Sequence, residues 1–107
     1  MTKIELVVPD KLTKIDPALR DSLLAGAIRD VAAIQLKEKE EEVKDAKRNL
    51  QRFEEIYNKS FEDFIKEFPE DANFKLHEDF VEWSFWNDVS KKSEHLINDL
   101  EYVLGKR

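Results

Sequence analysis

The chain has 107 residues, a length that suits a single domain. Charged residues make up 39% and apolar residues 41%, and the formal net charge is −6. This balance is too apolar for a disordered chain and too charged for a broad globular core, so it favours long helices with wide solvated faces. Cysteine is absent, which excludes a disulfide scaffold, a thiolate zinc site and a cysteine nucleophile.

Residues 1–15 are predicted to form an extended N-terminal arm. The run from residue 4 to residue 8 is apolar and rich in β-branched side chains, and Pro9 ends it, as is typical of a short β-strand. A lone strand has no ladder partner within this chain. We therefore expect it to pair with another chain or to lie across a helix.

The next element is predicted to be one long helix over residues 17–57. Asp16 followed by Pro17 is a typical helix start, and no further proline occurs before Pro69. A helix of this length measures roughly 60 Å, whereas a compact globule of this size has a radius of gyration of about 13 Å. The helix should therefore protrude and need a partner.

The long helix changes pattern along its length. Its first half is densely apolar between residues 23 and 34, and its second half has apolar residues in a heptad repeat that Lys39 interrupts. We expect this repeat to be the seam of a coiled coil between copies of the chain, most simply a dimer, with parallel and antiparallel pairing both open. The predicted seam residues are Leu36, Val43, Leu50, Phe53 and Tyr57, with Ala46 beside them.

The remaining sequence predicts two further helices. After a break at residues 58–60, a short helix should cover residues 61–68, and Pro69 ends it. A polar loop precedes a last helix over residues 78–104, whose apolar row from Trp86 to Val103 can pack back along the first helix. The predicted fold is all-α, an elongated helical hairpin with coiled-coil character.

No pattern in the sequence indicates a catalytic, cofactor or metal site. His77 and His95 lack the spacing that places two metal ligands on one helix face, and two distant glycines cannot form a phosphate loop.

Residues 1–36 have no net charge and residues 37–107 have a net charge of −6, which disfavours direct binding of nucleic acid. The start lacks a signal-peptide pattern and no stretch could span a membrane, so we expect a cytoplasmic protein that binds no membrane.

An aromatic cluster within seven residues is the most informative feature. Its apolar members point in all directions around a helix, so one neighbouring helix cannot cover them all. Two interpretations stay open. The cluster is either core throughout, clamped between the first helix and the short helix, or core on one side and a docking patch on the other. The cluster comprises Phe80, Val81, Trp83, Phe85 and Trp86.

The segment FEEIYNKSFEDF at residues 53–64, followed by EDFVEW at residues 78–83, resembles a family of small helical antitoxins from prokaryotic toxin–antitoxin pairs. The middle of these proteins commonly has a Phe-Glu pair, a Tyr-Gly turn, a Ser with aromatic residues opening a short helix, and an acidic, aromatic Glu-Trp stretch. The resemblance covers about residues 50–86. Asn58 stands where the family usually has Gly, and both residues suit a left-handed turn.

The resemblance implies a partner-neutralising protein that covers the active site of a basic, ribonuclease-type toxin encoded nearby. Carboxylates would match the basic groove of the toxin, and the arm would add a strand to it. The expected contact residues are Ile4, Leu6, Val8, Phe80, Trp83, Phe85 and Trp86. The alternative function is a self-associating coiled-coil protein whose role is assembly or scaffolding.

Overall fold

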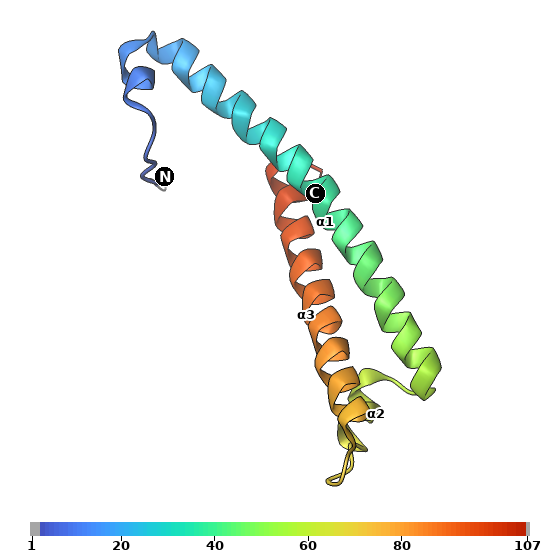
Figure 1. Cartoon of the computed structure of the whole chain (residues 1–107). Coiled ribbons are helices and arrows are strands. Elements are labelled where there is room, and N and C mark those ends of the chain that lie inside the picture. Colours follow the sequence, from blue (N-terminus) through green and yellow to red (C-terminus); the bar gives the residue numbers. More distant parts are fainter. Residues whose placement is uncertain (1–2, 107) are drawn as a thin grey trace.

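The computed structural model describes residues 3–106 and is an elongated helical hairpin (Figure 1). Helix α1 (Pro17–Tyr57) runs the length of the molecule, and helix α3 (Phe74–Val103) returns antiparallel along its second half. The short helix α2 (Phe61–Lys66) lies at the turn between them. The molecule measures 67 × 25 × 24 Å with a radius of gyration of 21.2 Å, so it is far longer than a compact domain of this size.

Helix α1 has the bounds that the sequence predicts. The Asp16 side chain accepts a hydrogen bond from the Leu19 backbone N–H at 3.0 Å, and Pro17 occupies the first helical position, where no N–H is needed. At the other end Asn58 has a φ of 54°, in the left-handed region that stops a helix.

The two later helices differ from prediction at their ends. Helix α2 stops at Lys66, two residues before the predicted end, and Pro69 follows shortly after. Helix α3 starts at Phe74, four residues before the predicted start at Glu78. Asn73 explains this difference, because its side chain accepts a hydrogen bond from the Leu76 backbone N–H at 2.9 Å and so caps a helix within the predicted loop.

The N-terminal arm contains no strand in the part that the structure describes. Residues 3–9 have no regular secondary structure, and a 3₁₀ helix, η1 (Asp10–Lys14), follows them and contacts α1. Thr13 stabilises this turn by donating a hydrogen bond to the Asp10 carbonyl at 2.6 Å. The strand prediction is therefore not supported here, where no neighbouring strand offers an edge. Residues 1, 2 and 107 of the predicted domain lie outside the described residues.

The predicted heptad seam packs within the chain. Leu36, Val43 and Phe53 are buried where α3 lies along α1, and Ala46 between them is fully buried. Tyr57 and Leu50 are half-buried against the aromatic core. These residues are thus buried within a single chain, whereas their heptad spacing predicts pairing between copies. The homodimer stays a prediction.

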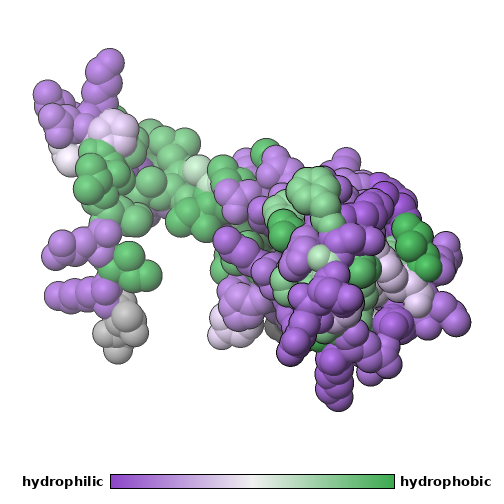
Figure 2. Space-filling view, turned by 60° about the horizontal axis from the view of Figure 1, so that its bottom comes forward, coloured by the Kyte–Doolittle hydropathy of each residue, from purple (hydrophilic) through white to green (hydrophobic). Residues whose placement is uncertain are grey.

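The N-terminal part of α1 runs alongside the last residues of α3 and then beyond its end (Figure 1). We call this segment, residues 17–31, the overhang. Leu100 and Val103, near the end of α3, line a shallow groove of about 460 Å³ together with Ala27, Ile28, Val31 and Ala32 of α1. Figure 2 shows apolar side chains gathered where this slender part leaves the thicker body of the molecule. No helix within residues 3–106 is long and apolar enough to cross a membrane.

The turn at Asn58 gives a test of the fold. Asn58→Gly should leave the free energy of unfolding within about 0.5 kcal/mol of the wild-type value, because glycine accepts a positive φ without strain. Asn58→Val should lower it by about 1–2 kcal/mol, because its Cβ clashes in this conformation. Urea unfolding followed by circular dichroism measures both, and equal effects of the two substitutions would contradict the turn.

Candidate interaction surfaces

Trp83 forms the centre of the aromatic core. Its side chain has no solvent exposure, and it stacks on Phe53 of α1 with ring centroids 5.5 Å apart. Phe64 of α2 packs against it at 4.9 Å and Phe61 at 5.4 Å. Trp83 therefore joins all three helices, so it is a core residue and not a free docking residue.

The other predicted contact residues of the cluster vary in exposure. Phe80 is half-buried against Phe61, Phe64 and Phe68, and Trp86 is half-buried with Phe85 in a T-shaped contact at 5.0 Å. Phe85 itself is 55% exposed. The cluster is thus core on one side and solvent-facing on the other, and docking of a partner on the exposed side stays a prediction.

A buried polar network sits beside the aromatic core. The Asp79 carboxylate is 3% exposed, and it accepts hydrogen bonds from the Tyr57 hydroxyl and, at 2.9 Å, from the Lys75 ammonium group. Burial, together with the hydrogen bond to Asp79, raises the pKa of Tyr57 to about 12. Burial by itself would raise the pKa of Asp79, but the hydrogen bonds from Tyr57 and Lys75 outweigh it and hold that pKa below its usual value.

A second polar group interrupts the α1–α3 seam. The Glu42 carboxylate accepts hydrogen bonds from the buried Ser93 hydroxyl at 3.0 Å and from the Lys39 ammonium group at 3.2 Å. The hydrogen bond from Lys39, followed by that from Ser93, lowers the pKa of Glu42. This arrangement explains why a lysine is tolerated in the heptad pattern, because its charge is paired at the edge of the seam. A polar layer of this kind fixes the register of two packed helices.

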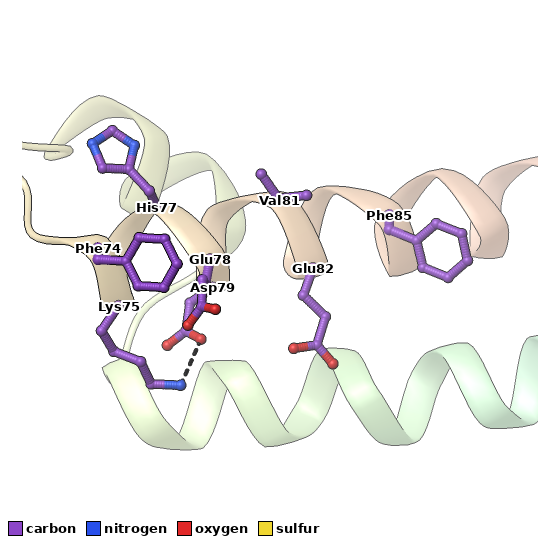
Figure 3. Close-up of a pocket in the computed structure, with 8 residues that line it drawn as sticks. All are labelled: Phe74, Lys75, His77, Glu78, Asp79, Val81, Glu82 and Phe85. Carbon is purple, nitrogen blue, oxygen red and sulfur yellow. Dashed lines mark hydrogen bonds and ion pairs between the residues drawn. The ribbon is translucent and has the colours of Figure 1, made fainter.

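The outward face of α3 carries an exposed apolar strip flanked by carboxylates. Phe74, Val81 and Phe85 are 77%, 66% and 55% exposed, and with Glu78 they fall within an arc of about 60° at 100° per residue. We call these four residues the α3 strip. They border an open groove of about 670 Å³ (Figure 3). Figure 3 shows Glu82 pointing from α3 toward α1, where Arg52 pairs with it at 3.0 Å.

Sequence reasoning missed most of this strip. The sequence pattern indicates Phe85 as a contact residue, but it predicts a loop at Phe74 and groups Val81 only with the aromatic cluster. The N-cap at Asn73 was the signal that could have revealed the strip, because it extends α3 back to Phe74 and aligns the four residues on one face.

The arm residues lie far from the aromatic core. Ile4 is 80% and Leu6 is 65% exposed, and Val8 is half-buried. Figure 1 places the arm beside the first turns of α1, whereas α2 and the start of α3 lie at the other end of the molecule. The predicted contact residues therefore do not form one surface.

The described residues also provide no grouped ligands for a metal ion. Among residues 3–106, no group of three or more His, Cys, Asp or Glu side chains is arranged so that it could hold a metal ion. His77 packs edge-on against Phe68 at 5.2 Å, and His95 lies 3.5 Å from Asp99 on the same helix. Comparison of the chain with protein-family models, with curated proteins and with solved structures finds no match.

The two faces of the cluster predict opposite results for two substitutions. Trp83→Ala should lower the free energy of unfolding by about 3–5 kcal/mol, because it opens a cavity between three helices. Phe85→Ala should cost about 1 kcal/mol or less, because its ring already faces solvent. Thermal or urea unfolding of both variants measures the difference, and a large loss in Phe85→Ala would show that this ring is core.

The network at Asp79 predicts how stability depends on pH. Asp79 has a lowered pKa in the folded state. Its contribution to the free energy of unfolding is therefore present at neutral pH and is lost as pH falls through the acid range. Tyr57 has a raised pKa, so its contribution is present below pH 10 and is lost as pH rises toward about 12. Asp79→Asn should make the free energy of unfolding depend less on pH in the acid range, as measured by urea unfolding at a series of pH values. An unchanged pH dependence in the acid range would contradict this role of Asp79.

Proposed function

We propose that this chain is a non-enzymatic protein-binding module that uses the α3 strip as its docking surface. The observation that carries the proposal is the alignment of Phe74, Val81 and Phe85, three large apolar side chains that remain exposed along one helix face. Exposed apolar patches with polar rims are typical of protein interaction sites. A helix face with anchors at such spacing suits a groove on a partner.

The charges around the strip select a basic partner. Residues 74–88 contain one lysine against four carboxylates; the lysine pairs with the buried Asp79 and Arg52 of α1 pairs with Glu82, so Glu78 and Asp88 give this face its net negative charge. The whole chain has a net charge of −6. Complementary potentials accelerate association and suppress wrong partners, so a basic protein is the partner that this surface favours.

We further propose, from the resemblance over residues 50–86, that the partner is a toxin and that this chain is its antitoxin. A ribonuclease-type toxin needs a basic groove to hold RNA, and an acidic helix with apolar anchors can cover such a groove. The contact residues then change from the sequence-based set. Phe85 stays in it, Phe74 and Val81 join it, and Trp83 supports the strip from beneath.

A growth assay tests this function. The gene beside this one is expressed alone and then together with it, and we expect growth arrest in the first case and rescue in the second, with co-purification of the two proteins. A harmless neighbour that does not co-purify would overturn the antitoxin proposal.

A matched pair of variants then tests the surface. Val81→Lys places a positive charge in the α3 strip and should abolish rescue and co-purification while the far-ultraviolet spectrum stays unchanged. Val31→Lys makes the same change at a valine that is 51% exposed in another part of the molecule, and it should leave capture intact. Equal capture by wild type and Val81→Lys would reject the strip as the docking surface.

Self-assembly is the second candidate function, and the overhang is the observation that favours it. Leu19, Leu23, Ile28 and Val31 of the overhang are each more than half exposed, and Ile28 and Val31 line an open apolar groove with the end of α3. Burial of these side chains would stabilise an assembly. Self-assembly and partner capture use different surfaces, so both can hold together.

A further inference from the structure

We propose that the overhang, together with the turn of α1 that follows it, is the interface of an antiparallel homodimer, in which residues 17–34 of two copies pack against each other. This inference rests on the self-assembly candidate and is independent of the α3 strip. It replaces the heptad seam, which α3 already fills, as the surface that a second copy would cover.

The apolar stripe of the overhang is not an extension of the seam that faces α3. Leu36 and Val43 lie seven residues apart on the α3-facing side. The residues seven and fourteen positions before Leu36 are Arg29 and Ser22, which are polar. Counting back from Ala46 in steps of seven gives one lysine and three alanines, namely Lys39, Ala32, Ala25 and Ala18. A longer α3 would therefore find few large apolar side chains to cover, so this surface is not simply a continuation of the hairpin.

A different face of the overhang carries the large apolar side chains. Leu24, Ala27, Val31 and Ile34 fall within an arc of about 80° at 100° per residue, and Arg20 lies in the same arc. This arc is centred about a third of a turn away from the middle of the α3-facing side of α1, and Ala27 and Val31 within it also line the groove beside Leu100 and Val103. Leu23 and Ile28 flank it, so the stripe is wide enough to seat another helix.

The charges of the overhang favour an antiparallel arrangement. Stripe positions 20, 24, 27 and 31 are spaced by four, three and four residues, so these four positions read the same in both directions, and Ile34 then lies opposite Pro17 of the second copy. Antiparallel copies place Leu24 opposite Ala27, and they place Arg20 opposite Val31 and beside Asp30 of the second copy. Because the dimer has two-fold symmetry, the pair between Arg20 of one copy and Asp30 of the other occurs twice.

A parallel arrangement has the opposite effect. It would place the two Arg20 side chains against each other at the interface, with each Asp30 about 15 Å away along the axis. Within one chain, the Arg20 Nε atom pairs with Asp21 at 3.2 Å, but a guanidinium group has further N–H donors for a second carboxylate. Charge complementarity thus identifies a second copy in antiparallel orientation as the occupant.

Light scattering and sedimentation of the full chain over a dilution series test the interface. We expect wild type to be a dimer that dissociates on dilution. Val31→Lys should weaken the dimer by more than about tenfold in dissociation constant, whereas Val81→Lys on the α3 strip should leave it unchanged. A monomeric wild-type protein, or a dimer that Val31→Lys leaves intact, would overturn the proposal.

Charge reversal tests the register. Arg20→Asp and Asp30→Arg should each weaken the dimer, and the double variant should restore most of the loss, because the two charges exchange places across an antiparallel interface. A parallel pair would show no such restoration. Helicity measured by circular dichroism controls for local unfolding of the overhang.

A spin label measures the orientation directly. The chain has no cysteine, so Lys37→Cys gives a single attachment site. In the antiparallel register the two labelled positions lie roughly 35 Å apart along the helix axes, whereas parallel helices would bring their backbones to about 10 Å. The short distance would reject the antiparallel dimer. These outcomes are independent of toxin capture, so failure of one proposal is distinguishable from failure of the other.

Discussion

The packing of Trp83 between α1 and α2 is the contact on which the hairpin depends. This indole is fully buried and touches Phe53 of α1 and both Phe61 and Phe64 of α2. It therefore fixes the turn, the start of α3 and the face that α3 presents to α1. Its Nε1 atom is buried without a hydrogen-bond partner among the described residues, so apolar and aromatic packing carries this contact.

Two constraints follow from this anchor, and together they leave two surfaces uncovered. Because Trp83 faces inward, Val81 and Phe85 must face outward on the same helix. Because α3 is thirty residues long and α1 is forty-one, α1 continues past the end of α3. The first consequence exposes the α3 strip, and the second exposes the overhang. The hydrogen bonds from Tyr57 to Asp79 and from Ser93 to Glu42 hold the two helices in register between these surfaces.

The sequence predicts the helices well but not what covers them. The bounds of α1 follow from local chemistry at Asp16, Pro17 and Asn58, which acts within a turn of the chain. The heptad repeat correctly marks a buried row, yet a repeat cannot tell whether its partner is another chain or the same chain returning. The start of α3 was missed because Asn73 lies among other polar residues that favour a loop. The surface at Phe74 was missed with it, since the strip exists only once the helix includes that residue.

Hydrogen–deuterium exchange of the full chain at high and low protein concentration tests the account most directly. The account predicts that amides of residues 35–57 and of α3 are protected equally at both concentrations, because the hairpin closes within one chain. Amides of residues 17–31 should lose protection on dilution, because a second copy covers that segment. Loss of protection in α3 on dilution would contradict the single-chain hairpin, and concentration-independent protection of residues 17–31 would contradict the dimer.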